Sequence, residues 1–317
     1  MSRRRLKPRE RFRDLHGIVL LDKPLGLSSN QALQAVRKGI FQAEKGGHTG
    51  ALDPLASGLL PLCFGEATKL AGMLLGSRKA YLAECRLGIT TTTADLEGEI
   101  ELERPVPALT DEVIEQALAK LRGRITQVPP AYSAIKQDGE RLYVKARRGE
   151  AVDIPSREVE VYRLELVSRS ENNLSFYVEC GSGTYVRSLA VDLGEDLGCG
   201  AHLVALRRLW VEPFREPAMV TLEQLQAAAA QGDEALLPWL LPVSAGLAGL
   251  PSLPLDAERT LAVSQGQQIP LDPSMTGQLA VYADDGRLLA LGEAVDGKLR
   301  IVRGFNLPSP GANSRQP

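Results

Sequence analysis

Apolar residues near the start of the chain alternate between short continuous runs and helical periods. GIVLLDKP at 17–24 is an apolar run ended by proline, which predicts a short buried strand. Ser28 and Gln31 then have the spacing of a capping box, which predicts an amphipathic helix through about Ile40. KAYLAECRLG at 79–88 has the residue types of another strand, whereas the polar TTTADLEGE after it predicts a loop. This alternation predicts a domain built from both strands and helices.

The same reading extends through the middle of the chain. Thr110 precedes a helical period that has acids in its first turn, bases near its end and a glycine at 123, so a helix is expected over 110–123. The segment 173–198 predicts a strand, a glycine turn and a helix, which brings Arg187 near the mouth of a cleft. Further strands are expected over 59–65, 157–167 and 201–214, and further helices over 65–75 and 221–231, the latter with a Thr221–Gln224 capping box.

Two stretches interrupt the regular pattern. Residues 128–155 combine paired prolines, aromatic residues and the basic cluster KARR, and they predict a protruding element because buried segments rarely carry so many charges. The composition shifts to Pro, Gly and Leu at 237–256, which indicates a domain boundary. Short strand patterns with the turns DDGR and VDGK follow up to about residue 306, so we expect a small β-rich module at 250–306. By composition the tail at 307–317 is expected to be disordered.

Composition restricts the function without revealing it. The 317 residues are 44% hydrophobic and 24% charged, which suits one large soluble domain with a small one attached. No run approaches the roughly 18–20 apolar residues of a membrane span, and IVLL after the basic N-terminus is too short for a signal peptide, so a cytoplasmic protein is expected. Four scattered cysteines and three histidines favour neither a disulfide frame nor a metal site. The net charge of −2 gives no global argument for a polyanionic partner, but bases gather at 2–13, 145–148 and 207–208, where they are either a phosphate-binding face or merely solvated.

One stretch concentrates candidate chemistry: EKGGHTGALDPLASGLL at 44–60. Asp53 lies where a glycine-dense turn meets an apolar run, so it either caps the turn or serves as a nucleophile or general base. Such a carboxylate is ionised at neutral pH, and a cationic partner would hold that charge. His48 is either a hydrogen-bonding turn residue or a functional group. Motifs for phosphate loops, dinucleotide turns, serine nucleophiles and zinc proteases are all missing from the sequence, so the pattern indicates covalent or acid–base work without a cofactor, and a metal-dependent hydrolase is disfavoured.

Five motifs together resemble the bacterial TruB family, the tRNA pseudouridine-55 synthases. They cover nearly the whole chain in the right order: LDKPLGLSS (21–29), GGHTGALDPLASGLLPLCFGEATKL (46–70), KAYLAECRLG (79–88), PPAYSAIKQDGERLYVKARRGE (129–150) and CGSGTYVRSLAVDLGEDLGCGAHLVALRRL (180–209). Ala51 stands where threonine is more often expected, and the basic extension at 1–15 is not part of the family pattern.

The resemblance implies an α+β pseudouridine synthase fold with a central mixed, mainly antiparallel sheet flanked by helices. The catalytic domain would cover 16–245, with 128–155 as an RNA-gripping insertion, and a PUA-like RNA-binding module would cover 250–306. It also implies isomerisation of uridine 55 in the T arm of tRNA: the N1–C1′ bond breaks, the base rotates, and C5 bonds to C1′. No cofactor or metal is implied, the partner is the tRNA T stem-loop, and a monomer without membrane or protein partner is expected. A tRNA-folding factor that acts independently of catalysis is the alternative.

By position in the motifs, Asp53 matches the family's catalytic aspartate, which attacks C1′ or C6 or acts after deprotonation at C2′. Tyr81 matches the tyrosine that stacks on the base and takes part in removing the C5 proton. Arg187 matches the arginine that pairs with the aspartate, and Leu206 matches an apolar wall of the pocket. His48 matches the histidine that takes the place of the flipped base.

Three further residues complete the expected site at a greater distance from the chemistry. Lys23 and Lys69 lie in the motifs as phosphate or structural contacts, and Tyr185 lies in the motif of Arg187 as a substrate-binding residue.

Overall fold

The structure is a computed structural model that describes residues 12–130, 132, 136–137, 140–141, 148 and 154–309. Residues 1–11 of the expected basic extension, most of the expected insertion at 128–155 and residues 310–317 of the expected tail lie outside the described residues. In the described part of the insertion, β8 (Lys136–Gln137) pairs with β9 (Glu140–Arg141).

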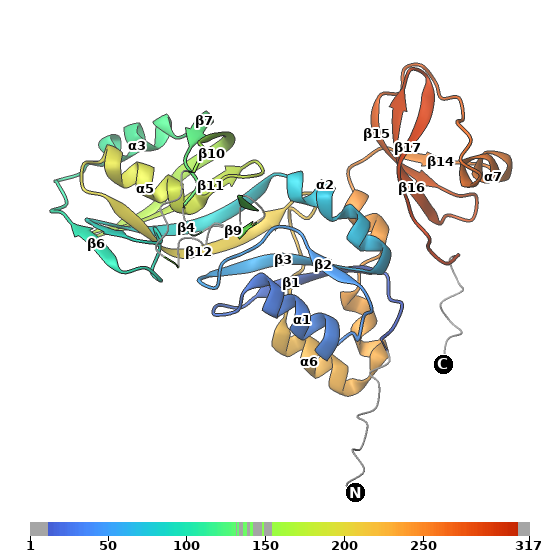
Figure 1. Ribbon diagram of the computed structural model, residues 1–317, viewed down its shortest axis with the longest axis horizontal. Coiled ribbons are helices and arrows are strands. Elements are labelled where there is room, and N and C mark those ends of the chain that lie inside the picture. Colours follow the sequence, from blue (N-terminus) through green and yellow to red (C-terminus); the bar gives the residue numbers. More distant parts are fainter. Residues whose placement is uncertain are drawn as a thin grey trace, which may run out of the picture.

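A nine-stranded sheet forms the centre of the described chain (Figure 1). Its strand order is β13-β1-β3-β12-β4-β11-β10-β7, and β2 pairs with β3 beside this path. Two neighbouring pairs, β1–β13 and β3–β12, are parallel and the others are antiparallel, which confirms the expected mixed, mainly antiparallel sheet. The strands are β1 (Gly17–Lys23), β2 (Gly46–His48), β3 (Ala56–Phe64), β4 (Lys79–Leu87), β7 (Gly123–Gln127), β10 (Arg157–Ser170), β11 (Asn173–Cys180), β12 (Ala201–Val211) and β13 (Val220–Thr221).

Helices flank this sheet, and their ends follow the local sequence. Both predicted capping boxes are present, Ser28 with Gln31 and Thr221 with Gln224, and Thr110 caps its helix as expected. The segment predicted as a helix over 65–75 begins as a 3-10 helix and continues as a short α-helix. The helices are α1 (Ser29–Gly39), η1 (Gly65–Leu70), α2 (Ala71–Gly76), α3 (Asp111–Lys120), α5 (Val186–Asp196) and α6 (Leu222–Gln231). In the described residues no helix has the length and apolarity needed to cross a membrane.

The main core lies between the sheet and helices α1, α3, α5 and α6. Val36 of α1, Leu62 of β3, Phe176 of β11 and Leu189 of α5 are all buried in one apolar cluster. Each such side chain contributes roughly 1.5–3 kcal/mol by leaving water. The cluster holds α1 and α5 on the same face of the sheet.

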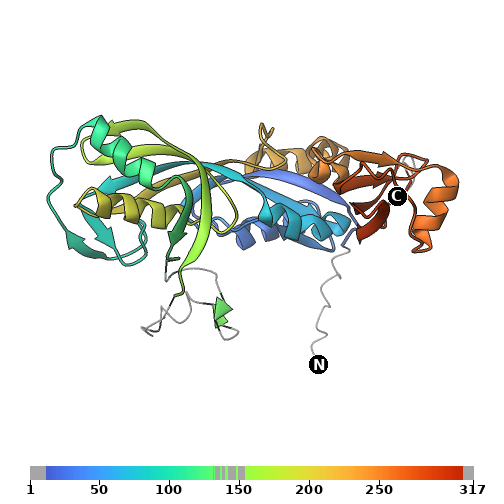
Figure 2. The same cartoon turned by 90° about the horizontal axis from the view of Figure 1, so that it is seen from above.

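The polar loop expected at 91–99 is present as the turn of a hairpin, whose two strands the sequence does not predict. β5 (Ile89–Thr91) pairs with β6 (Ile100–Glu103), and the turn between them carries a buried Asp95. All four residues of β6 are exposed, so no alternation of apolar and polar residues marks this strand. Figure 2 shows this hairpin at one end of an elongated molecule, opposite the C-terminal module.

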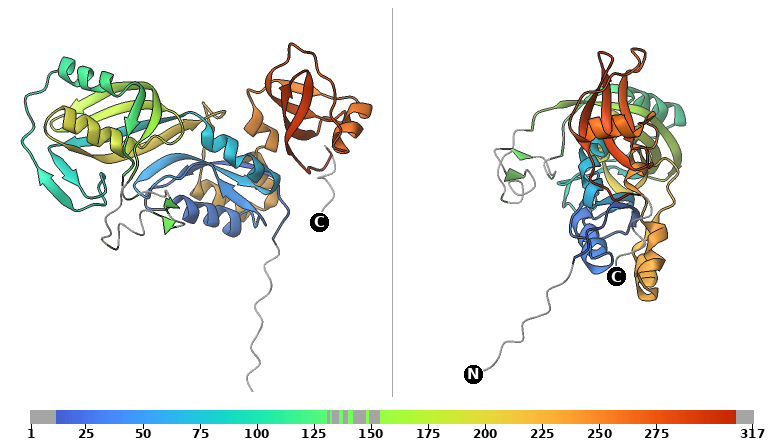
Figure 3. Two further views of the ribbon diagram at one scale, coloured as in Figure 1. Left: turned by 45° about the horizontal axis from the view of Figure 1, so that its top comes forward. Right: turned by 90° about the vertical axis from the view of Figure 1, so that its right-hand side faces the viewer.

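The C-terminal β-rich domain has a sheet of its own (Figure 3, left view). Its strand order is β14-β15-β16-β17. The predicted turns DDGR and VDGK join β15 to β16 and β16 to β17. The elements of this domain are β14 (Ser252–Pro254), α7 (Ala257–Ser264), β15 (Gly277–Tyr282), β16 (Leu288–Val295) and β17 (Lys298–Gly304). Before it lie η2 (Asp233–Trp239), which packs on the main core, and η3 (Val243–Leu247), which packs beside β1.

A second apolar cluster joins this domain to the rest of the chain. Ile18 of β1 and Leu59 of β3 share it with Leu288 and Leu291 of β16 and with Phe305. The cluster lies on the face of the sheet opposite α1 and α5, because Ile18 and Leu59 alternate along their strands with the residues of the main core.

Candidate active site

The loop that carries Asp53 is fixed by the turn that opens α1. The Ser29 hydroxyl accepts a hydrogen bond from the Leu52 amide at 2.7 Å and donates to the Leu52 carbonyl at 3.0 Å. The Gly26 amide donates to the Pro54 carbonyl at 2.8 Å. These bonds hold the peptide groups on both sides of Asp53, so two motifs that are 23 residues apart in sequence form one rigid unit.

Asp53 is paired with Arg187 of α5. The Asp53 Oδ2 lies 3.0 Å from the Arg187 Nη2, and the arginine side chain is 6% exposed whereas that of Asp53 is 46% exposed. The guanidinium is therefore buried in the protein, while the carboxylate it binds stays open to an incoming molecule. This geometry agrees with a functional carboxylate rather than a simple turn cap.

Asp95 holds Arg187 from the other side. Its Oδ2 lies 3.0 Å from the Arg187 Nη1, and its side chain is 2% exposed. Asp95 in turn accepts hydrogen bonds from the Thr93 hydroxyl and, at 3.0 Å, from the Glu97 amide. Arg187 also donates to the carbonyls of Thr93 at 3.1 Å and Tyr132 at 2.9 Å, so every contact keeps its guanidinium in one orientation.

The pKa of Asp53 reflects this mixed environment. Burial raises the pKa of the Asp53 carboxyl, the Arg187 charge lowers it, the Asp95 charge raises it and the Lys23 charge lowers it, with a net rise. A carboxylate whose charge is held but poorly hydrated keeps more of its basicity and nucleophilicity than one in open water.

Tyr81, Leu206 and Arg208 lie side by side on the sheet face below Asp53. Tyr81 of β4 is the direct cross-strand partner of Arg208 on β12, and Leu206 pairs with Ala83 two residues along. Residues two apart on a strand share a face, so these side chains all point toward the α1–α5 side. Tyr81 is buried and Leu206 packs against the main core. Tyr81 and Leu206 form a small apolar surface next to the carboxylate.

The Tyr81 phenol is neutral in this setting. Burial raises its pKa above the ordinary value of 10.0, while the charge of Arg208 and a hydrogen bond from it act in the opposite direction. The Asp53 charge also raises the pKa of Tyr81, so the two groups lie within electrostatic reach of each other.

His48 ends β2, half-buried, five residues before Asp53. Its Nδ1 is buried without a hydrogen-bond partner among the described residues. Burial and the Arg208 charge lower the pKa of His48 below 6.5, so the imidazole is uncharged at neutral pH. An uncharged ring offers a flat surface for stacking rather than a proton for transfer.

Lys23 is fully buried close to Asp53. Its Nζ donates to the carbonyls of Pro24 at 2.8 Å and Leu27 at 2.6 Å, which anchors the turn before α1. Burial lowers the pKa of Lys23 to about 8, against the opposing effect of the Asp53 charge. The structure therefore brings Lys23 to the site as a support for the loops.

The structure does not bring Lys69 to Asp53. Its Nζ lies 2.6 Å from Glu66 and 3.0 Å from the Gly304 carbonyl of the C-terminal domain.

Tyr185 immediately precedes α5, where Gln127 binds both its amide (2.7 Å) and its carbonyl (3.0 Å). The Arg157 guanidinium covers its ring at 4.8 Å.

Two residues at the site, Asp95 and Arg208, are not predicted from the sequence. Asp95 lies in a polar stretch that contains several acids, and only its burial distinguishes it. Arg208 belongs to a pair of arginines that reads as a surface patch, but its side chain is fully buried, whereas neighbouring Arg207 binds Asp22 on the opposite face at 2.7 Å. Strand alternation could have separated Arg207 from Arg208 had the burial of both faces of β12 been known.

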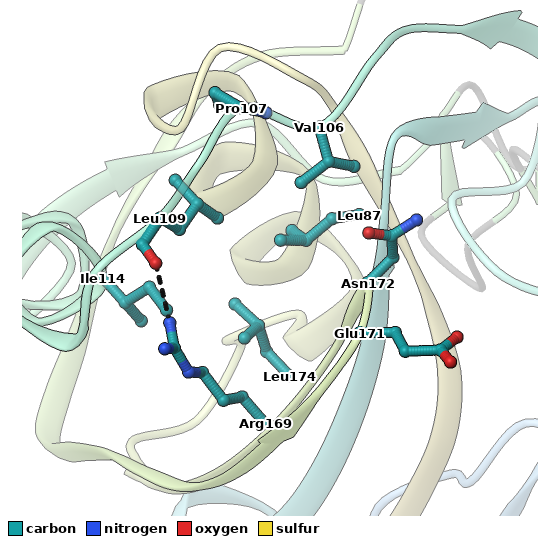
Figure 4. Close-up of a pocket in the computed structure, with 9 residues that line it drawn as sticks. All are labelled: Leu87, Val106, Pro107, Leu109, Ile114, Arg169, Glu171, Asn172 and Leu174. Atoms are coloured by element: carbon teal, nitrogen blue, oxygen red, sulfur yellow. Dashed lines mark hydrogen bonds between the residues drawn. The ribbon is translucent and has the colours of Figure 1, made fainter.

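The described cavities lie elsewhere. Figure 4 shows one of about 320 Å³ beside α3, in which Arg169 donates to the Leu109 carbonyl at 2.9 Å. Another, of about 360 Å³, includes Phe214 and Trp239. Neither is lined by a candidate residue. No group of three or more His, Cys, Asp or Glu with metal-binding geometry occurs in the part of the chain that the structure describes.

Solved structures share this arrangement of elements, and they define the class. Cbf5 in a Cbf5–Nop10–Gar1 complex aligns with a TM-score of 0.71 and 25% identity over 95% of this chain and 90% of that one. A chain of an H/ACA RNP bound to a substrate RNA containing 2′-deoxyuridine aligns with the same TM-score, at 24% identity, over 92% of this chain and 86% of that one. The chain therefore has the pseudouridine synthase fold, of the α+β class, and it is an enzyme of that class.

Sequence comparison names the family. Residues 38–186 match the model of the TruB family pseudouridylate synthase N-terminal domain, and residues 187–248 match the tRNA pseudouridylate synthase B C-terminal domain. A tRNA pseudouridine synthase B of Xanthomonas campestris pv. campestris is 57% identical over 95% of this chain and 97% of its own length. One of Xylella fastidiosa is 55% identical over 95% of this chain and its own full length. The chain belongs to the TruB family of pseudouridylate synthases, as its motifs indicate.

Proposed function

We propose that this enzyme converts the uridine at position 55 in the T arm of tRNA into pseudouridine. The names of its relatives support tRNA as the substrate, and the motifs shared with the family support the T arm. The observation that carries the proposal is the half-exposed Asp53 held by the buried Arg187 beside Tyr81. A carboxylate arranged in this way suits covalent work on one nucleotide, and the exchange of bonds within that nucleotide needs no cofactor or metal.

Asp53 is the proposed catalytic aspartate, and Arg187 keeps it ionised and oriented. Attack at C1′, attack at C6 and the route through C2′ deprotonation each require the ionised oxygen. Tyr81 stacks on the base, and its phenol is placed to take part in removing the C5 proton. Leu206 packs against the other side of the base as an apolar wall.

The target uridine is proposed to be flipped out of the T loop before reaction. The uncharged ring of His48 is suited to fill the place that the base leaves, which offsets part of the few kcal/mol lost in unstacking. Lys23 supports the loop, and Tyr185 contacts the substrate near the N-terminus of α5. The enzyme acts as a monomer, and the domain at 250–306 together with the insertion at 128–155 grips the RNA.

Asp53→Asn tests the assignment. The purified variant and the wild type are incubated with an unmodified tRNA transcript and with a T-arm stem-loop, and new pseudouridine is mapped by chemical probing. We expect loss of isomerisation with RNA binding within about threefold of wild type, because Asn has nearly the same shape but cannot ionise. Asp22→Asn is the matched control, since Asp22 is paired with Arg207 on the other face of the sheet. Continued conversion by Asp53→Asn would refute the nucleophile assignment.

A folding factor that acts on tRNA independently of catalysis is the second candidate. An enzyme that opens the T loop in order to flip a base could also help misfolded tRNA to refold. If the inactive Asp53→Asn variant restores tRNA function in cells lacking the wild-type enzyme, this second role is supported.

A further inference from the structure

Arg208 is a fully buried cation without a carboxylate partner among the described residues. It is one of the largest side chains with no exposed surface, and its Nε donates to the Leu59 carbonyl at 2.6 Å while its Nη2 donates to the Gly50 carbonyl at 3.1 Å. Tyr81 on β4 is its direct cross-strand partner, and a hydrogen bond from Arg208 acts to lower the pKa of the Tyr81 phenol against the larger effect of burial. A buried, unpaired guanidinium is expensive, so its presence needs an explanation other than stability.

Arg208 connects three parts of the site: it donates to the carbonyls of Gly50 and Leu59, and it faces Tyr81 across the strand pair. Gly50 precedes Asp53 by three residues. Leu59 comes after Asp53 in the sequence and lies on β3. One planar guanidinium thus binds the chain before and after the nucleophile loop and also the ring proposed to hold the base. Arg208 therefore links the nucleophile loop to that ring, in addition to the Ser29 and Arg187 contacts that hold Asp53.

The backbone around Arg208 is adapted to this position. Gly50 has a φ of +81°, and a Cβ there would lie 3.2 Å from the Arg208 Nη1. Gly58 has a φ of +96°, and a Cβ there would lie 2.2 Å from the Arg208 carbonyl oxygen. Both glycines of the motif thus make room for this one residue.

We propose that Arg208 is a positioning residue of the isomerisation, which fixes the Tyr81 phenol relative to the Asp53 loop. This inference rests on the proposed function and adds a residue to it. Since Arg208 lies beneath the site and not on its surface, it acts through Tyr81 and Gly50 rather than by touching the nucleotide.

A double-mutant cycle with Tyr81→Phe tests the proposal. We expect Arg208→Gln to lower kcat on an unmodified tRNA transcript on the order of 10²-fold, as misplacement of a reacting group does, with KM within about threefold of wild type. In the Tyr81→Phe background the phenol is already lost, so the same replacement should lower the remaining rate by less than about tenfold. Arg208→Lys keeps the charge but loses the planar guanidinium that binds two carbonyls at once, so we expect kcat to be partly restored relative to Arg208→Gln.

Arg207→Gln is the matched control, because the adjacent arginine faces away from the site and should leave kcat within about twofold. An unchanged kcat in Arg208→Gln, or equal losses with and without the Tyr81 phenol, would overturn the inference. So would failure of both Arg208→Gln and Arg208→Lys to fold, because Arg208 would then serve the core alone. A wild type that forms no pseudouridine would instead refute the proposed function.

Discussion

Replacing Asp95 with asparagine tests the buried ion pair between Asp95 and Arg187, which lies behind the pair between Arg187 and Asp53. Asp95 binds Arg187 at 3.0 Å and accepts two further hydrogen bonds within its own turn. Removing one partner of a buried pair costs about 3–5 kcal/mol in general. Here asparagine keeps the shape and part of the hydrogen bonding, and Arg187 keeps Asp53 as a counter-ion, so we expect about 2–3 kcal/mol of lost stability.

The pH dependence gives the sharper result. The Asp95 charge raises the pKa of Asp53, so its removal should lower that pKa. An ionised Asp53 is needed for reaction, and activity is lost as pH falls through its pKa. The acid limb of the kcat/KM profile should therefore move to lower pH in Asp95→Asn, even though the rate at neutral pH falls about tenfold or more as Arg187 loses orientation.

Thermal unfolding and pH–rate profiles on a tRNA transcript measure both effects. Asp22→Asn is the control, since the partly exposed pair of Asp22 with Arg207 should contribute less than about 1 kcal/mol. An acid limb that stays in place or moves to higher pH would refute the electrostatic reasoning. An unchanged melting temperature would refute the claim that the Asp95–Arg187 pair supports the fold.

Three further changes have expected outcomes. Gly50→Ala should cost about 1–2 kcal/mol and reduce kcat, because φ is +81° and the new Cβ would crowd Arg208; circular-dichroism melts and single-turnover assays measure these effects, and unchanged values would count against the loop geometry. Burial lowers the pKa of Lys79 from 10.5 to about 8, so the unfolded chain binds more protons between these values and the stability contributed by this group rises with pH. Urea titrations at pH 8 and 10 should show that the unfolding free energy rises less with pH in Lys79→Met than in the wild type. An equal rise in unfolding free energy for both proteins would contradict this expectation. Burial acts to raise the pKa of Glu66, but hydrogen bonds from Lys69 and from the Asn306 amide outweigh it, so the net pKa is lowered. The stability that Glu66 contributes is therefore present above pH 4.5 and lost as pH falls through the folded pKa. Glu66→Gln should cost less than about 1 kcal/mol of unfolding free energy at pH 7 and nothing in strong acid, and an equal loss at both pH values would contradict the assignment.

Local signals in the sequence predict most of the individual elements. The helix α1 follows from Ser28 and Gln31, and β4 follows from its residue types, because capping and strand preference depend on neighbouring residues. The exposed strand β6 has no such signal, since it packs on no core and pairs only with β5. Local pattern therefore predicts elements that bury a face and misses those that do not.

The sequence predicts those residues of the site that belong to recognisable motifs. Asp53 and Arg187 are expected from family motifs, and the structure brings them within 3.0 Å of each other. The roles of Asp95 and Arg208 depend instead on which strands are neighbours. Arg208 meets Tyr81 only because β12 pairs with β4 in one register, and no property of either segment alone specifies that register.

The apolar cluster shared by β1, β3 and β16 limits how this protein can be dissected. A chain truncated before β14 would remove Leu288, Leu291 and Phe305 from this cluster and uncover apolar residues of η3, on which β16 packs. Such an uncovered surface favours self-association, so a shortened form would lose solubility along with any RNA contacts. Poor activity of a truncated chain would therefore say little about whether the C-terminal domain touches RNA, and substitutions on its outer surface are the better means of asking that question.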